Sequence, residues 1–227
     1  MNQKEVENVK SRAISAMFYS FGGFVANSGL QFVTTIILAR LLLPEDYGLL
    51  GMIMIFVSIS QIFIDSGMTA ALVREKNPTE DDFSTVFYYN LGLAILLYII
   101  LFVSANAISS FFYEPRLVSI IRVVGVNLII GSFGLIQRTI LVRKLDFKSQ
   151  TKIEVLAGLI AGLMAILMAF FGFGVWSLVV QLLSKQMIIS TFFVIHNRWK
   201  PLLVFNISSF KRLFGFGWKL LATGLLA

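Results

Sequence analysis

The residues of this chain that are best placed to bind a charged ligand lie inside long apolar runs, where a polar side chain is costly. Lys185 is the eleventh residue of the 21-residue run 175–195, too deep for its ammonium group to reach water easily from either end. A cation at that depth needs an anionic partner, either a carboxylate of the protein or a phosphate of a substrate. We therefore predict that Lys185 pairs with one of these two.

Polar residues recur at helical spacing in four of the apolar runs. They stand three or four positions apart, so each set shares one face of a helix. Such faces either line a water-accessible cavity or form hydrogen bonds between helices. For single residues we favour the second interpretation, and for four complete stripes we favour the cavity. The stripes are Ser20, Gly23, Asn27, Gln31 and Thr34; Ser58, Gln61 and Asp65; Asn127, Gly131, Gly134 and Arg138; and Ser177, Gln181, Ser184 and Lys185.

Two other charges inside the runs each allow two interpretations. Asp65 stands just before Ser66 and Gly67, where it would either cap a break in the helix or bind a coupling ion or proton. Arg138 stands near one end of its run, where its guanidinium group would either hold a diphosphate through two hydrogen bonds or anchor the helix at the lipid headgroups.

Membrane-spanning helices are the elements that must position these residues. The chain is 57% hydrophobic with a mean hydropathy of +0.84, outside the range of soluble domains. About 20 apolar residues cross a hydrocarbon core of about 30 Å. Six runs reach that length: 13–39, 48–73, 86–108, 117–142, 153–171 and 175–195.

We therefore predict an all-α polytopic membrane protein. A cytoplasmic tail at 1–12 precedes a six-helix transmembrane lobe at 13–195. A cytoplasmic interlobe linker at 196–212 leads to the start of a seventh helix at 213–227, which is too short to cross the membrane. We accordingly expect the chain to be part of a longer protein with a second lobe.

The basic residues lie unevenly about the predicted membrane. Thirteen precede the first run or lie in the even-numbered connections, whereas the odd-numbered connections hold only Arg40 and Arg116. The positive-inside rule then places the N-terminus in the cytoplasm. The net charge of +7 thus indicates topology and contact with anionic lipid, not a nucleic-acid surface. The thirteen are Lys4, Lys10, Arg12, Arg74, Lys76, Arg143, Lys144, Lys148, Lys152, Arg198, Lys200, Lys211 and Arg212.

Several classes of site are disfavoured by the residue types. The chain has no cysteine, which excludes disulfides, thiolate nucleophiles and cysteine-based metal sites. It holds no HExxH, nucleophile elbow, P-loop or dinucleotide motif, and its one histidine, His196, lies among basic residues in a connection. We therefore expect no enzymatic activity, no cofactor and no metal site. The identity of a coupling ion, Na⁺ or H⁺, is left open.

Five segments in order resemble a known family. They are IILARLLLPEDYGL (36–49), FIDSGMTAALVR (63–74), FFYEPRL (111–117), VRKLDFKSQTKIE (142–154) and GFGVWSLVVQ (172–181). Pro44 in the first segment predicts a tight turn between two membrane spans. Together the segments are similar to the N-terminal half of the Wzx-type polysaccharide and O-antigen flippases, members of the multidrug/oligosaccharidyl-lipid/polysaccharide exporter superfamily.

The resemblance implies a transporter of the cytoplasmic (inner) membrane that moves polyprenyl-diphosphate-linked oligosaccharide by alternating access, for export of lipopolysaccharide or exopolysaccharide. Its partners would be this substrate, membrane lipids and other polysaccharide-assembly membrane proteins. On this hypothesis the cations in the cavity attract the diphosphate and the amides hydrogen-bond the sugars, while Asp65 serves ion coupling. The candidate substrate-binding residues are Lys185, Arg138, Asn27, Gln31, Gln61 and Gln181.

The first connection holds charges of a different kind. The distribution of basic residues puts Arg40, Glu45 and Asp46 on the outer, periplasmic side of the membrane. We therefore assign them to an outer rim or gate and not to the capture of a cytoplasmic substrate.

Three other functions fit parts of the pattern. A cation-coupled multidrug exporter of the same superfamily would favour acidic residues in the cavity, whereas Asp65 is the one acidic residue well inside a run. A membrane glycan polymerase or ligase needs sizeable periplasmic loops, and the outward connections here have about eight residues or fewer. A scaffold without transport activity fits only if this chain is the mature product.

Overall fold

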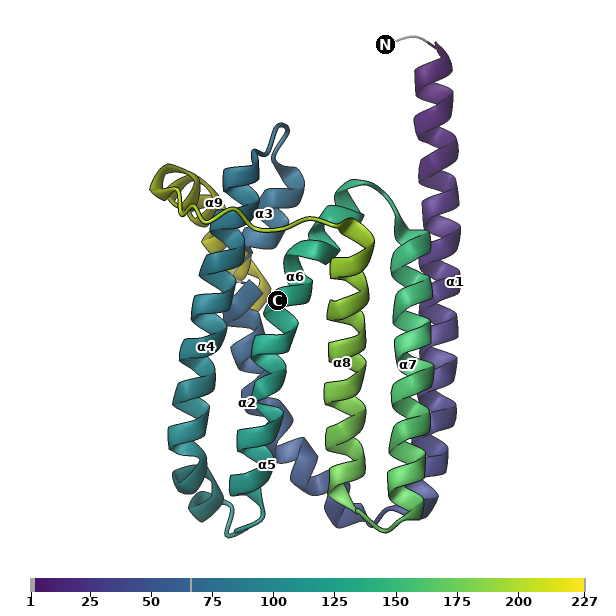
Figure 1. The fold of residues 1–227 in the computed structure, drawn as a ribbon, viewed down its shortest axis with the longest axis vertical. Coiled ribbons are helices and arrows are strands. Elements are labelled where there is room, and N and C mark those ends of the chain that lie inside the picture. The colour runs from purple at the N-terminus through teal and green to yellow at the C-terminus, as the bar shows by residue number, and fades with distance from the viewer. Residues whose placement is uncertain (1–2, 66, 227) are drawn as a thin grey trace.

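The computed structural model describes the backbone of residues 3–65 and 67–226 and the side chains of residues 21–65 and 67–219. Within these residues the chain forms helices and no strand (Figure 1). The helices are α1 (Gln3–Leu41), α2 (Pro44–Asp65), α3 (Met68–Arg74), α4 (Glu80–Phe111), α5 (Leu117–Val124), α6 (Val126–Arg143), α7 (Phe147–Phe170), α8 (Val175–Asn197) and α9 (Ile207–Leu226).

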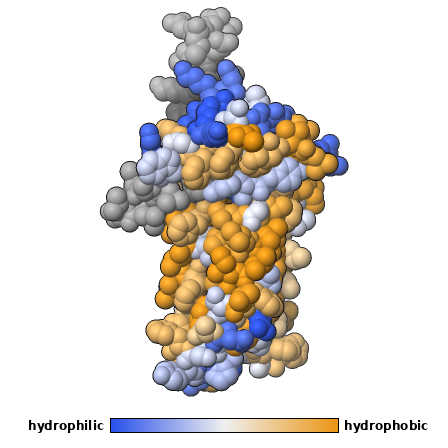
Figure 2. Space-filling model, turned by 90° about the vertical axis from the view of Figure 1, so that its left-hand side faces the viewer, coloured by the Kyte–Doolittle hydropathy of each residue, from blue (hydrophilic) through white to orange (hydrophobic). Residues whose placement is uncertain are grey.

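Six segments of the described chain are long and apolar enough to cross a membrane, which confirms the predicted all-α polytopic fold. They are Phe21–Leu41, Pro44–Arg74, Glu80–Phe111, Leu117–Arg143, Phe147–Phe170 and Val175–Asn197. Figure 2 shows a broad apolar band on one face of the molecule between hydrophilic ends. Large apolar side chains such as Phe24 and Phe32 are about two-thirds exposed or more on α1, as expected for a lipid-facing surface.

Several boundaries differ from those expected. The predicted second span is interrupted, because α2 ends at Asp65 and α3 begins at Met68, with Gly67 in the left-handed conformation. The segment 1–12, expected to be a tail, is helical from Gln3 and continues into the first span. The stretch between α8 and α9 covers 198–206, because α8 extends to Asn197 and α9 begins at Ile207, and the role of 196–212 as an interlobe linker stays a prediction. The predicted turn at Pro44 is present, with proline at the first helical position of α2.

The helices lie in two groups that α6 and α8 join (Figure 1). On one side α1 packs along α7, and α7 packs along α8. On the other side α4 packs against α5, α6 and α2, while α3 and α9 lie together near its N-terminal end. One apolar core joins α2, α4, α5 and α8 near the C-terminal end of α4, and a second joins α3, α4, α6 and α9 near the N-terminal end of α4.

Small residues allow the close approach of α1 and α7. A methyl group built on Gly158 would lie 3.0 Å from the Leu30 side chain, and one on Gly162 would lie 3.0 Å from Thr34 Oγ1. Ala165 is fully buried next to these glycines and belongs to an apolar cluster that includes residues of α1. Small residues at this spacing are how membrane helices gain contact in the absence of a hydrophobic driving force.

The C-terminal end of α3 is held by a single guanidinium group. Arg143 Nη1 donates to the carbonyl oxygens of Leu72, Val73 and Glu75 at 2.6, 2.9 and 2.8 Å. These carbonyls lack partners within the helix, because the last turn of any helix leaves its acceptors unpaired. Arg143 is the last residue of α6, so this contact ties the ends of α3 and α6 together.

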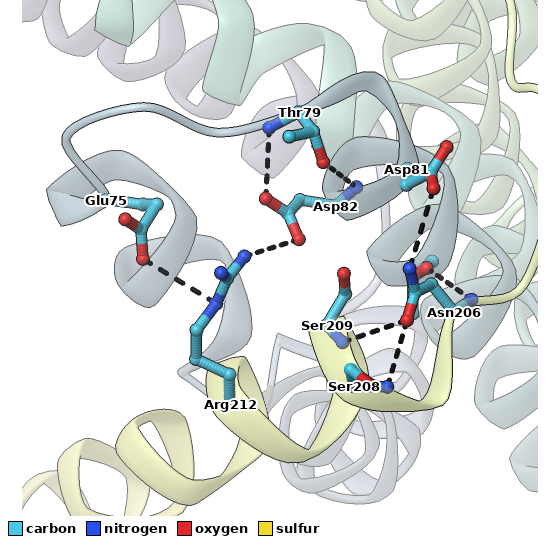
Figure 3. A network of polar contacts seen from close by, with 9 residues as sticks. Glu75, Thr79, Asp81, Asp82, Asn206, Ser208, Ser209 and Arg212 are labelled. Atoms are coloured by element: carbon cyan, nitrogen blue, oxygen red, sulfur yellow. Dashed lines mark hydrogen bonds and ion pairs between the residues drawn. The ribbon is translucent and has the colours of Figure 1, made fainter.

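The linker and the first turns of α9 are attached to the N-terminal end of α4 by polar contacts (Figure 3). Thr79 and Asp82 form a capping box at the start of α4, and the fully buried Asp82 carboxylate also accepts from Arg212 Nη2 at 2.6 Å. Asn206 caps α9 through the N–H groups of Ser208 and Ser209. These contacts fix the first turns of α9 on the six-helix lobe.

The connection between α6 and α7 also contacts the end of α8. Asp146 caps α7 by accepting from the Ser149 N–H at 3.1 Å, and its other oxygen lies 3.2 Å from His196 Nε2. Partial burial raises the pKa of Asp146, but the hydrogen bonds from Ser149 and the contact with His196 outweigh burial and hold the pKa below its ordinary value. His196, expected to be a surface residue, thus has a structural contact.

We predict that Gly162→Leu destabilises the protein and that Gly92→Leu does not. A leucine at 162 would overlap Thr34 and push α1 away from α7, at a cost of about 1–3 kcal/mol. Gly92 has nothing within 4 Å of its Cβ position, and replacing it removes a poor helix former. Thermal unfolding in detergent, followed by tryptophan fluorescence, measures both variants. Equal midpoints would refute the predicted contact.

We also predict that Asp82→Asn loosens α9. Asparagine can still cap α4, but it loses the charge that holds Arg212, which is worth about 1–3 kcal/mol. The neighbouring Asp81→Asn is the matched control, because Asp81 makes only a 3.5 Å contact with Asn206. Limited proteolysis within 198–206 should be faster for Asp82→Asn than for Asp81→Asn. The same rate in both variants would count against the role of the ion pair.

Candidate functional site

A cavity of about 200 Å³ lies among α1, α7 and α8, with one side chain from α2. It brings together four of the six predicted substrate-binding residues: Lys185, Gln181, Asn27 and Gln31. Its volume is below the usual 300–1,000 Å³ of ligand pockets, so in this conformation it would hold a few waters or part of a substrate. The full lining is Asn27, Leu30, Gln31, Thr34, Thr35, Leu50, Gly158, Leu178, Gln181, Leu182 and Lys185.

Lys185 is the charged residue of this cavity. It lies ten residues along α8, about 15 Å from the N-terminal end of that helix, and its side chain is partly buried. Among the described residues, no carboxylate lies within 4.0 Å of its ammonium group. Of the two partners that the sequence allowed, the described part of the chain therefore does not supply the carboxylate.

Glu154, near the N-terminal end of α7, forms a polar cluster beside this cavity. Its carboxylate accepts from Gln150 Nε2 at 2.9 Å and from Asn27 Nδ2 at 3.5 Å, and it lies 3.9 Å from Arg138 Nη2. The side-chain oxygen of Asn27, Oδ1, is buried without a hydrogen-bond partner among the described residues. Asn27 thus links the cluster to the cavity and keeps an acceptor available.

Sequence reasoning overlooked Glu154, although a signal was present. Glu154 is the second residue of the apolar run 153–171, next to a basic connection, so it was not counted as an acid inside a span. However, it stands four residues before Gly158 and eight before Gly162, the two glycines that face α1. Helical spacing therefore points its side chain towards α1 as well.

Gln61 lies apart from the cavity. Its amide group approaches Gly131 of α6, and the amide of Gln186 from α8 approaches the same glycine. The predicted polar stripe of α6 is accordingly divided, because part of it faces α8 and part faces α7. Gly134 lies against Ser190 of α8, whose hydroxyl donates to the Ile130 carbonyl at 2.9 Å, whereas Arg138 faces α7.

Asp65 lies at the break between α2 and α3 and is exposed. Its carboxylate accepts a hydrogen bond from the Thr69 hydroxyl, one turn into α3. It does not line the cavity that holds Lys185. This contact is what a residue supporting a helix break would make, and the coupling role of Asp65 stays a prediction.

The three predicted rim residues differ in their surroundings. Asp46 is buried, accepts from the Leu43 N–H at 3.1 Å and lies against Gly174 in the turn between α7 and α8. Glu45 lies 3.6 Å from Arg116, whose hydrogen bond with Glu114, followed by the charge of Glu114, raises the pKa of Arg116. Arg40 is exposed and makes no ion pair among the described residues. Asp46 and Glu45 therefore tie the connection between α1 and α2 to the turns between α7 and α8 and between α4 and α5.

A scan of known families finds one that matches residues 37–227, and its description is "Polysaccharide biosynthesis protein". The match covers most of the chain, including the cavity-lining residues of α2, α7 and α8, whereas those of α1 precede it. The chain belongs to this family. The relationship agrees with the resemblance to Wzx-type proteins that the five sequence segments indicate.

Curated members of this family resemble the chain at moderate identity. The succinoglycan biosynthesis transport protein ExoT of Rhizobium meliloti is 28% identical over 79% of the chain and 36% of its own length. The teichuronic acid biosynthesis protein TuaB of Bacillus subtilis is 29% identical, over 70% of the chain and 33% of its own length.

A third relative is the lipopolysaccharide biosynthesis protein WzxC of Escherichia coli, which is 23% identical over 66% of the chain and 31% of its own length. The chain thus spans about a third of the length of the curated relatives it matches. No solved structure matches the chain with significance.

We predict that the cavity that holds Lys185 admits water and that the opposite face of α1 does not. Because the chain has no cysteine, the labelling of a single introduced cysteine has no background from other thiols of the chain. Gln31→Cys in the cavity should react with a charged, water-soluble thiol reagent, since such reagents need a hydrated thiolate. Phe32→Cys, the adjacent residue with a 67% exposed apolar side chain, should not react. Equal labelling of the two variants would exclude a hydrated cavity.

Proposed function

We propose that this chain forms the first lobe of a flippase that carries a lipid-linked oligosaccharide diphosphate across the cytoplasmic membrane. The observation that carries the proposal is the placement of Lys185 in a cavity with three amide side chains and no carboxylate partner among the described residues. Membership of the polysaccharide biosynthesis family supports it, as does the name of ExoT, which is a transport protein of succinoglycan biosynthesis.

The proposed mechanism follows from what the hydrocarbon core excludes. A diphosphate and its sugars are too polar to cross lipid without a hydrated path, whereas the polyprenyl tail can stay in the membrane. In this scheme Lys185 attracts the diphosphate, and Asn27, Gln31 and Gln181 hydrogen-bond sugar hydroxyls. Burial of Lys185 strengthens its attraction to an anion, because a charge pair is less screened in a low-dielectric site.

Arg138 would act before Lys185 on the path from the cytoplasm. It lies 21 residues along the α5–α6 span, about 31 Å from the outer end, compared with about 15 Å for Lys185. With the N-terminus in the cytoplasm, this depth places Arg138 at the inner mouth. Glu154 beside it would give way as the diphosphate approaches, and the two lobes would then rock to open the outer side.

One observation supports the alternative function of a cationic-drug exporter, and another counts against it. Glu154 is a carboxylate beside the cavity, which such an exporter could use. However, Glu154 already lies 3.9 Å from Arg138, and the cavity itself holds Lys185 and no acidic residue. The local charge therefore favours an anionic substrate. The short outer turns between α1 and α2 and between α7 and α8 argue against a glycan polymerase or ligase.

The test replaces Lys185 in the complete protein, expressed in a strain that lacks its own copy. Lys185→Ala should lower surface polysaccharide by tenfold or more, equivalent to about 1.4 kcal/mol of lost interaction, and leave lipid-linked oligosaccharide on the cytoplasmic leaflet. Lys185→Arg should retain most of the transport, since it keeps the charge. Lys211→Ala, an exposed lysine of α9, is the control. Full transport by Lys185→Ala at normal protein level would overturn the assignment.

A further inference from the structure

A second cavity, of about 320 Å³, lies between α3 and α9, far in sequence from the residues of the proposed substrate path. It is lined by three cations, one carboxylate and three apolar residues. The cations come from both helices and from the loop after α3. The lining residues are Ala71, Arg74, Glu75, Lys76, Arg212, Leu213 and Phe216.

Arg212 is held in a fixed position in this cavity. Its Nη2 donates to the buried Asp82 carboxylate at 2.6 Å, and its Nε lies 3.9 Å from Glu75, as Figure 3 shows. The single carboxylate of the lining is therefore already shared with Arg212. A guanidinium group held in this way loses little freedom when it binds a further anion.

The other two cations of the lining have no acidic partner in the part of the chain that the structure describes. The Arg74 guanidinium lies over the Phe216 ring, 5.6 Å from its centre, and Arg74 and Lys76 make no ion pair among the described residues. Both side chains are exposed. The lining thus carries more positive charge than its one carboxylate balances, which favours an anion.

Apolar surface adjoins these cations. Ala71, Leu213 and Phe216 form one wall, and Trp218 on the same helix is 51% exposed. Arg74 is the last residue of the membrane-spanning segment Pro44–Arg74, so the cavity lies at the level where lipid headgroups meet the hydrocarbon core. A soluble anion would gain nothing from the apolar wall, whereas an acyl chain would pack against it.

We propose that this cavity binds the phosphate of an anionic phospholipid, with the guanidinium groups of Arg74 and Arg212 and the Lys76 ammonium group around the headgroup. Guanidinium groups suit phosphate because they donate two parallel hydrogen bonds. Basic pockets between helices on the cytoplasmic side are suited to anionic headgroups. The diphosphate of a lipid-linked sugar has the same chemistry, and the experiment separates the two sources.

A lipid in this position would join the six-helix lobe to the helix that follows the linker. The backbones of α3 and α9 meet here, because a methyl group built on Gly67 would overlap the carbonyl of Gly217. A ligand that contacts both helices stabilises the arrangement in which they touch, in proportion to its occupancy. The docking of α9 would then depend on the composition of the cytoplasmic leaflet.

The experiment compares thermal unfolding in nanodiscs of phosphatidylcholine with and without phosphatidylglycerol. The unaltered protein and Lys211→Gln should both gain several degrees from phosphatidylglycerol, because Lys211 is an exposed cation of α9 outside the lining. Arg74→Gln/Lys76→Gln should lose at least half of that gain. Its midpoint in pure phosphatidylcholine should equal that of the unaltered protein, which shows that the variant folds.

Two outcomes would overturn the proposal. One is a phosphatidylglycerol gain that is absent in the unaltered protein or the same in the double variant. The other is a gain that appears only with polyprenyl diphosphate and depends on Arg74 and Lys76, which would assign the cavity to the transported substrate. Lys185→Ala should keep the full gain in midpoint from phosphatidylglycerol, so the lipid-site proposal and the proposed transport function are tested independently.

Discussion

No water reaches the hydrocarbon core of a membrane, so the protein itself must supply a partner for each polar group that it carries there or must enclose a hydrated space. This constraint accounts for polar contacts between helices within the spans, and similar contacts occur at the helix ends. Ser190 donates to a carbonyl of α6, and Asn197 Nδ2 donates to the Gln137 carbonyl at 2.7 Å. Where the described residues supply no partner, as for Asn27 Oδ1 and the Lys185 ammonium group, the side chains line a cavity.

The membrane spans could be predicted from sequence because hydropathy depends on composition and length alone. The number of spans, the tight turn at Pro44 and the close packing of small residues on α7 follow from local patterns. The exact ends of the helices do not follow from local patterns, because they depend on contacts with residues that are distant in the sequence. Thus α8 continues to Asn197, whose side-chain amide donates to Gln137 of α6, and α9 begins at Ile207 after the Asn206 cap.

The cavity was only partly foreseeable for the same reason. Helical spacing places Gln31, Gln181 and Lys185 each on a polar face, but it does not state which faces meet. Gln61 has the same pattern and yet faces Gly131 of α6, because α2 packs mainly against α4, α5, α6 and α8. Glu154 was overlooked because one residue separated it from a basic connection, although the glycines after it already marked the face towards α1.

Arg143 has a mechanical consequence. By binding three carbonyl oxygens at the end of α3, it joins this short helix to α6. The helical structure is interrupted between α2 and α3, next to Gly67. A tilt of α2 would therefore be absorbed at the interruption and would not be transmitted to α3. The α3 part of this span is therefore anchored to the C-terminal end of α6, and the α2 part can change its tilt relative to α3 without moving that anchor.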